Sequence, residues 1–186
     1  MRYFIGLLAI VFIVLIGVLI FGGGGKKTPK GPTILPLTQY ANTDASVSLT
    51  INGQINGDDA HRVIKITVDK DSRELDIIQG YSGHVLSANV TYNTPDAYRV
   101  FLRALDLSSF TSAKKPTSAN ADPMGQCPDG LRYVYQLNQN GNSLVNLWST
   151  NCPGSLGNFN GNAAQVTDLF EKQITNYETL TENVAL

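Results

Sequence analysis

Two cysteines are the residues whose type and spacing most directly imply chemistry in this chain. Cys127 and Cys152 are each followed by proline, and both lie just outside the ends of strand-like segments. Such a pair can form a disulfide, remain as two free thiols, or supply half of a metal site. A metal site would need further ligands, and the two histidines, His61 and His84, are distant in sequence. We therefore expect a Cys127–Cys152 disulfide, with the other two states as alternatives.

A serine and a histidine lie between glycines in the segment Gly80–His84, GYSGH. A hydrolase nucleophile of the G-x-S-x-G type sits on a turn between a strand and a helix, and this segment has neither the pattern nor a following helix. Closeness in sequence does not by itself make Ser82 and His84 a catalytic pair. The segment is more typical of a tight turn or a bulge, so we predict no catalytic residue in it.

The acidic segment Asp69–Asp71 resembles the opening of a calcium-binding loop. However, Arg73 and Glu74 stand where such a loop needs an oxygen ligand and a glycine, and no acid closes the loop. A hairpin turn explains the segment better. The chain also lacks a phosphate-binding glycine loop, a C-x-x-C pair and a carboxylate dyad. We therefore predict neither a metal ion nor a cofactor.

The segment Leu131–Thr150 has the pattern of a hairpin. Asn140-Gly141 lies between two strand-like runs, which is a strong signal for a two-residue type I′ turn. A regular ladder from this turn pairs Tyr133 with Trp148 and gives one face an aromatic and aliphatic character. Aromatic residues at the strand period usually face the core, so core packing is the first interpretation. An interaction surface formed by Tyr133, Tyr135 and Trp148 is the second.

The remaining patterns predict the elements that position these residues. Val47, Leu49 and Ile51 recur at the strand period of two, and turn dipeptides such as Asn52-Gly53 separate the strand-like segments. Thr94–Asp96 gives a helix start with a hydroxyl cap, a proline and an acid. We expect an α+β fold, an antiparallel sheet of about five strands with two helices on one face, preceded by a single N-terminal transmembrane helix. The expected strands are 46–51, 62–68, 73–79, 84–92 and the hairpin 131–150, and the expected helices are 95–108 and 163–177.

The most apolar stretch is Tyr3–Phe21, nineteen consecutive residues without a charge, an amide or a proline. At about 1.5 Å per residue, such a helix spans roughly 28 Å, close to the hydrocarbon thickness of a bilayer. A cleaved signal peptide is the alternative, but its apolar region is typically about 7 to 15 residues, and no A-x-A-like site follows. We expect an uncleaved anchor, with residues 3–21 in the lipid bilayer. The expected parts are an anchor at 1–21, a linker and extended segment at 22–45, a domain at 46–180 and a tail at 181–186.

The anchor region and the domain differ in the sign of their net charge. Basic residues flank the anchor at positions 2, 26, 27 and 30, whereas residues 31–186 contain ten basic and fifteen acidic residues, a net charge of about −5. An acidic domain is unsuited to phosphate neutralisation, so we predict no nucleic-acid partner. The positive-inside rule slightly favours a cytoplasmic domain, whereas the cysteine pair favours an oxidising compartment. We predict a single-pass protein of the cell membrane with an extracytoplasmic domain.

The layout resembles bacterial proteins that carry an N-terminal membrane anchor and a small α+β domain. The segments Leu107–Phe110, Cys127–Tyr133 and Leu169-Phe170 also resemble parts of small secreted protease inhibitors of the emfourin type. We expect a non-enzymatic binding or envelope-interaction module with a protein or envelope partner, which acts through the free face of the sheet or the 111–130 loop. An inhibitor of an extracellular protease is the first alternative. A small hydrolase with unfamiliar site residues is the second.

Overall fold

The computed structural model of the chain describes residues 34–117, 120–154 and 157–186. These residues belong to one compact unit, Ile34–Leu186. The predicted anchor at 3–21 and the first part of the predicted linker lie outside the described residues. None of the helices within the described ranges is long and apolar enough to cross a membrane.

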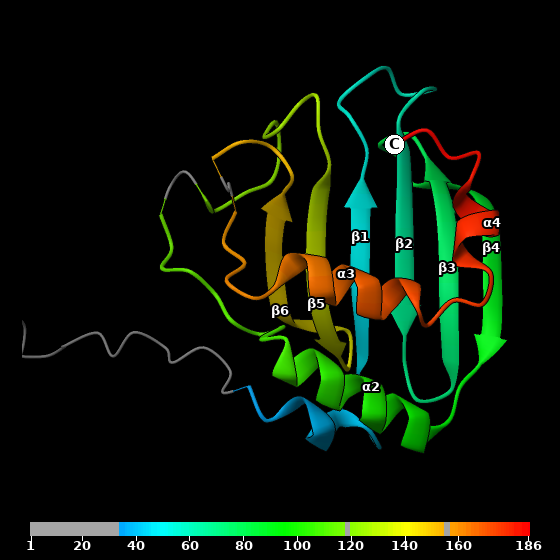
Figure 1. Ribbon diagram of the computed structural model, residues 1–186, viewed down its shortest axis with the longest axis vertical. Helices are drawn as coiled ribbons and strands as arrows, with labels where there is room; N and C mark the ends of the chain where they lie inside the picture. The colour runs from blue at the N-terminus through cyan, green and yellow to red at the C-terminus, as the bar shows by residue number, and fades with distance from the viewer. Residues whose placement is uncertain (1–33, 118–119, 155–156) are drawn as a thin grey trace, which may run out of the picture. The chain divides into compact units, whose positions relative to one another are not determined.

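Six antiparallel strands form one sheet in the order β4-β3-β2-β1-β5-β6 (Figure 1). The predicted α+β class with an antiparallel sheet is confirmed. The described sheet has six strands, one in each of the expected strand segments when the hairpin is counted as two, whereas the expected total was about five. In β4, a bulge opposite Ile77 and Ile78 inserts Leu86 as an extra residue. The strands are β1 (Ser46–Asn52), β2 (Arg62–Val68), β3 (Ser72–Gln79), β4 (His84–Tyr92), β5 (Arg132–Gln139) and β6 (Asn142–Thr150).

Helix α3 crosses one face of the sheet, and α2 lies across the lower end of the same side (Figure 1). Helix α2 begins as predicted, because Thr94 Oγ1 accepts the main-chain N–H of Ala97 at 3.2 Å and Pro95 occupies the first turn. The second predicted helix, 163–177, is shorter than expected, because α3 ends at Glu171; a separate helix, α4, begins after Asn176, which adopts a left-handed conformation with φ 61°. The helices are η1 (Leu37–Tyr40), α2 (Pro95–Leu107), α3 (Ala163–Glu171) and α4 (Tyr177–Thr181).

A row of aromatic rings fills the space between the helices and the sheet. Phe101 of α2 meets Phe170 of α3 edge to face, with ring centroids 5.2 Å apart. Phe110, at the end of the α2 segment, packs against Phe170 and against Tyr135 of β5. All of these rings are buried, and pairs in such geometries contribute about 0.5–1.5 kcal/mol beyond their burial. These contacts hold α2 and α3 against β5.

The compact unit is longer at both ends than the expected domain at 46–180. Leu37 and Tyr40 of η1, in the segment expected to be an extended linker, are buried in the core. At the other end, Val184 and Leu186 pack against the core, and the main chain of Leu186 lies directly against Gly53. Their apolar side chains explain this docking, because burial of such surface is favourable.

The loop between α2 and β5 covers part of the sheet face opposite the helices. Trp148 of β6, on that face, donates its Nε1–H to the carbonyl of Asn120 at 3.0 Å. Farther along the loop, the carbonyl of Pro128 accepts the N–H of Ile55 at 2.8 Å. The loop therefore covers β5 and β6 on this face. It does not cover β3 and β4, at the other side of the sheet.

Candidate functional site

The two cysteines form the predicted disulfide. Cys127 and Cys152 are bonded, with Cα atoms 5.8 Å apart, and no free cysteine remains. Gly130 lies directly against the bridge, because a Cβ at this position would come within 2.6 Å of Cys127 Sγ. The bridge closes the base of the β5–β6 hairpin. Within the described ranges, no group of three or more His, Cys, Asp or Glu residues is arranged to hold a metal ion.

The three aromatic residues considered as an interaction surface do not gather at the surface. Tyr135 is fully buried, with its ring centroid 4.2 Å from that of Phe159. Trp148 is 2% exposed and lies on the opposite face of the sheet, under Asn120. Only Tyr133, which is half-buried, reaches a groove. Tyr135 therefore agrees with the first interpretation of this cluster, core packing.

A bulge in the hairpin accounts for the separation of these rings. The predicted turn at Asn140-Gly141 is present, with φ values of 51° and 74° that suit a type I′ turn. Beyond it, Leu144 is an extra residue in β6, so Tyr133 pairs with Ser149 and the predicted Tyr133–Trp148 pair is wrong. A shift of one residue moves a side chain to the other face, which is where Trp148 lies.

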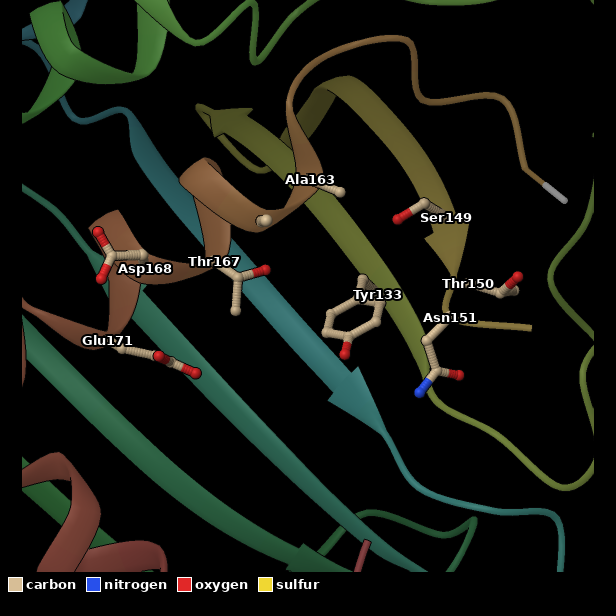
Figure 2. A pocket seen from close by; sticks show the side chains of 9 residues that line it. Tyr133, Ser149, Thr150, Asn151, Ala163, Thr167, Asp168 and Glu171 are labelled. Atoms are coloured by element: carbon tan, nitrogen blue, oxygen red, sulfur yellow. The ribbon is translucent and has the colours of Figure 1, made fainter. Parts of the chain in front are cut away.

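A groove of about 400 Å³ opens between the end of the hairpin and α3 (Figure 2). Tyr133 lies between the two walls of this groove, with Thr167 and Glu171 of α3 on one side and residues Ser149–Asn151 on the other. Thr167 and Glu171 are four residues apart, so they share one face of the helix. Neither Thr167 nor Glu171 was predicted as a site residue from the sequence. The i,i+4 spacing of Thr167 and Glu171, next to the core residue Val166, was the pattern that could have indicated them.

Electrostatics in this groove favour neutral groups. Burial raises the pKa of Glu171, the hydroxyl of Tyr177 opposes that shift, and the negative charge of Asp168 adds to it. Burial also raises the pKa of Tyr133, with a further contribution from the negative charge of Glu171. The phenol of Tyr133 therefore remains a hydrogen-bond donor well above neutral pH.

The hydroxyl groups of the groove differ in their hydrogen bonding. Ser149 Oγ shares a hydrogen bond with the Tyr135 hydroxyl at 3.0 Å, and this partner is no general base for a serine nucleophile. Thr150 Oγ1 is buried and has no hydrogen-bond partner within the described part of the chain. The groove can thus accept and donate hydrogen bonds, and its side chains are not arranged as a nucleophile with an adjacent base.

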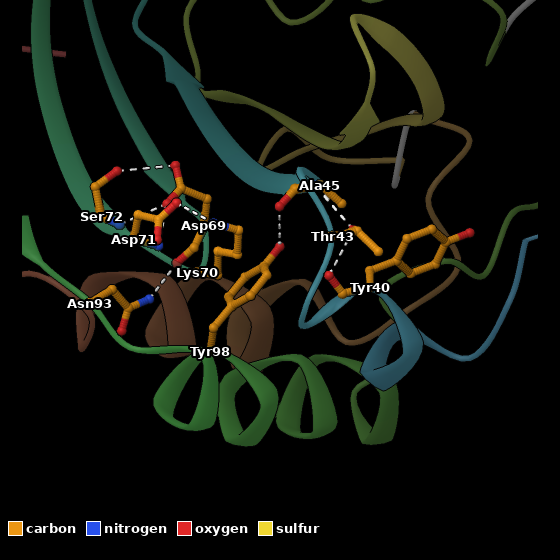
Figure 3. A network of polar contacts seen from close by, with 9 residues as sticks. All are labelled: Tyr40, Thr43, Ala45, Asp69, Lys70, Asp71, Ser72, Asn93 and Tyr98. Carbon is orange, nitrogen blue, oxygen red and sulfur yellow. Dashed lines mark hydrogen bonds and ion pairs between the residues drawn. The ribbon is translucent and has the colours of Figure 1, made fainter.

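The two other motifs examined for chemistry form turns. Gly80 and Gly83 have φ values of 70° and 80°, so Gly80–Gly83 makes the expected turn between β3 and β4. No hydrogen bond joins Ser82 to His84, both of which are described and exposed. At the other end of β3, Asp69 Oδ1 accepts the main-chain N–H groups of two following residues at 2.7 Å (Figure 3). That carboxylate stabilises a hairpin turn, as the sequence predicted.

Edge strand β4 carries the largest group of exposed apolar side chains on the sheet. Val90 is 61% exposed and Tyr92 is 79% exposed, and Val85 and Leu86 precede them on the same strand. Val90 and Tyr92 pair with Glu74 and Ser72 of β3, so they lie on the face opposite the helices. An exposed apolar strip on a free sheet edge is typical of an interaction site.

In comparisons with known proteins, no family model and no curated sequence matches this chain.

Proposed function

We propose that the chain is a membrane-anchored extracytoplasmic module that binds an envelope protein without catalysing a reaction. In this proposal, the partner adds an extended segment to the free edge of β4. The anchor is Tyr3–Phe21, whose length and apolar composition suit a bilayer. The disulfide supports an oxidising compartment, because such bonds are rare in the reducing cytoplasm of most cells.

The exposed edge of β4 is the observation that carries the proposal. Natural sheets usually protect an edge strand with lysine, proline, a bulge, a covering loop or a short length. β4, HVLSANVTY, has nine residues and neither lysine nor proline, and its bulge at Leu86 leaves Ser87–Tyr92 in regular pairing with β3. Its outer main-chain groups are therefore suited to hydrogen bonding with another strand, which is the basis of recognition by strand addition.

The composition of β4 indicates what kind of segment it would bind. No residue of β4 carries a fixed charge, and Val90 and Tyr92 give its open face an apolar end. A partner strand with apolar residues at alternate positions would bury these side chains, while charged residues there would lose hydration. The proposed occupant is therefore an uncharged, extended segment of another protein, and a second copy of this chain is the competing outcome.

Site-specific photocrosslinking in intact cells tests this proposal. A benzophenone amino acid would replace Tyr92 in the full chain, and the same residue would replace Val100 in the control. Val100 is also an exposed apolar residue, at 71%, but it lies on α2. We expect a crosslinked adduct from position 92 and none from position 100. Val90→Lys should reduce the adduct at position 92, because it places a charge beside the bound strand.

Mass spectrometry of the adduct separates the outcomes. A different envelope protein crosslinked through an extended segment is the expected result. An adduct of two copies of this chain contradicts the proposed partner, and so does equal crosslinking at positions 92 and 100. Failure to form any adduct at position 92 in cells that display the protein would overturn the proposed role of β4.

A further inference from the structure

A second hollow lies on the sheet face opposite the helices, at the end where β1 meets β5. Its volume is about 370 Å³. The β1–β2 loop, the β3–β4 turn and the α2–β5 loop all contribute to its walls. The lining residues are Asn52, Ile55, His61, Tyr81, Asp122, Pro123, Met124, Gly125 and Arg132.

Arg132 is a buried cation in this hollow. It is 6% exposed, and its Nη2 donates to the carbonyl of Gly53 at 2.6 Å. Within residues 34–117, 120–154 and 157–186, no carboxylate forms an ion pair with Arg132 and no other hydrogen bond of its guanidinium is present. A guanidinium has five N–H donors, and among the described residues no Arg132 nitrogen is both enclosed and without a partner, so the donors that Gly53 does not use are open to solvent. The hollow therefore contains unused donor capacity with a positive charge.

The walls beside Arg132 are apolar and held in place. Tyr81 stacks on the ring of buried His61, with ring centroids 4.2 Å apart and the ring planes at 11°. The hydroxyl of Tyr81 donates to the carbonyl of Asn56 at 2.9 Å, and its main-chain N–H donates to Asp58 at 2.7 Å. These three contacts fix Tyr81 although 57% of it is exposed. Such an ordered aromatic wall loses little conformational entropy when a ligand binds.

Three of the large exposed apolar residues of the domain line this one hollow. Met124 is 82% exposed, Tyr81 57% and Ile55 40%. Outside β4, the other exposed apolar residues, Leu35, Val100 and Leu107, line none of this hollow. The gathering of apolar walls around a few polar groups is typical of small-molecule sites.

We infer that this hollow binds a small monocarboxylate with an apolar body, whose carboxylate group contacts Arg132 and whose body lies between Tyr81 and Met124. The planar guanidinium matches the two oxygens of a carboxylate, which favours this anion. Asp122 is the one acid among the lining residues, and its Oδ1 accepts the N–H of Met124 at 2.8 Å. Its negative charge disfavours ligands with a second anionic group. This binding site is separate from β4, so the inference does not depend on the proposed function.

Calorimetric titration of the full chain with 3-phenylpropionate tests the inference. Its amide, 3-phenylpropanamide, has the same shape without the charge and is the matched ligand control. We expect the amide to bind about tenfold more weakly, the loss of about one charge-assisted contact. Asp122→Asn should tighten binding of the carboxylate, because it removes the repulsive charge. Equal affinity for the acid and the amide, or no measurable binding of either, would overturn the inference.

Two substitutions of lining residues test the site from the side of the protein. Arg132→Lys should weaken binding of 3-phenylpropionate about fivefold or more, because lysine lacks the two-pronged donor geometry. Because Arg132 is buried, this variant can also affect folding, so Met124→Ser provides a second test at an exposed wall. Leu107→Ser is its control, since Leu107 is 71% exposed on α2 and far from the lining set. Equal loss of binding in the Met124 and Leu107 variants, or no loss in either, contradicts the assignment.

Discussion

The hydroxyl of Tyr98 on α2 donates a hydrogen bond to the main-chain carbonyl of Ala45, at 3.0 Å (Figure 3). Both residues are fully buried, at 0% exposure each. Ala45 immediately precedes β1, so this one bond joins α2 to the start of a central strand. Burial raises the pKa of Tyr98, which keeps the hydroxyl protonated as a donor.

Tyr98→Phe should lower the free energy of unfolding by about 1–2 kcal/mol, because it leaves a buried carbonyl without its donor. Urea denaturation at pH 7 measures this change. Tyr92→Phe is the matched control, since Tyr92 is 79% exposed and should change stability by less than about 0.5 kcal/mol. Equal effects of the two substitutions would show that the Tyr98 bond contributes nothing specific.

Alkaline pH should destabilise the domain through Tyr135. Burial raises the pKa of Tyr135 to about 12, partly opposed by hydrogen bonds with Ser149 and Thr167. In the unfolded chain the phenol titrates near its ordinary pKa of about 10. The stabilising contribution is therefore complete below pH 10 and declines between pH 10 and 12, because the unfolded state loses the proton first. The slope approaches about 1.4 kcal/mol per pH unit for this one group.

Denaturation of the wild type and of Tyr135→Phe at a series of pH values measures that slope. Burial raises the pKa values of Tyr98 and Tyr177 as well, so the variant should retain a shallower decline. Identical slopes above pH 10 in the two proteins would contradict the role given to the buried Tyr135 phenol.

Replacement of both cysteines should destabilise the domain by about 3 kcal/mol, because the disulfide restrains the unfolded chain over a separation of 25 residues. The variant is Cys127→Ala with Cys152→Ala, compared by urea denaturation with the wild type in the presence and absence of a reductant. Reduced wild type should match the variant. A midpoint that changes with neither reduction nor substitution would show that the bridge does not stabilise the fold.

Glu171→Gln should raise stability slightly at pH 7, by a few tenths of a kcal/mol, because Glu171 is only partly buried and solvent screens its charge. Burial raises the pKa of Glu171, so its ionisation is harder in the folded state than in the unfolded state. Its contribution is therefore most favourable below about pH 4, and it falls as the pH rises through the folded pKa. Glu182→Gln, at an exposed position, is the control, and an equal gain there would contradict the effect of burial.

Local patterns were sufficient to predict much of the fold. The strict alternation in Val47–Ile51 and the cap at Thr94 each have a nearby physical cause, and both elements formed where expected. The Asn140-Gly141 turn was equally well defined. The strand pairing beyond the turn could not be predicted from the sequence. The bulge at Leu144 depends on which residues the core can accept and not on the turn itself.

The candidate binding sites were largely hidden from sequence analysis. The Arg132 hollow combines the β1–β2 loop, the β3–β4 turn and the α2–β5 loop, and no spacing rule relates residues so far apart. Likewise, Val90 and Tyr92 had the pattern of ordinary strand residues. Their exposure follows from the position of β4 at the edge of the sheet, which is a property of the strand order.

The central proposal is that the disulfide-bonded domain lies on the extracytoplasmic side of the membrane. Maleimide labelling of intact cells tests it most directly, with a reductant and a maleimide that both remain outside. Cys127 and Cys152 should be labelled only after reduction, and an added Ser82→Cys in the exposed β3–β4 turn should be labelled without it. Labelling of all three positions only after lysis, with the native cysteines reactive without reductant, would contradict the claim.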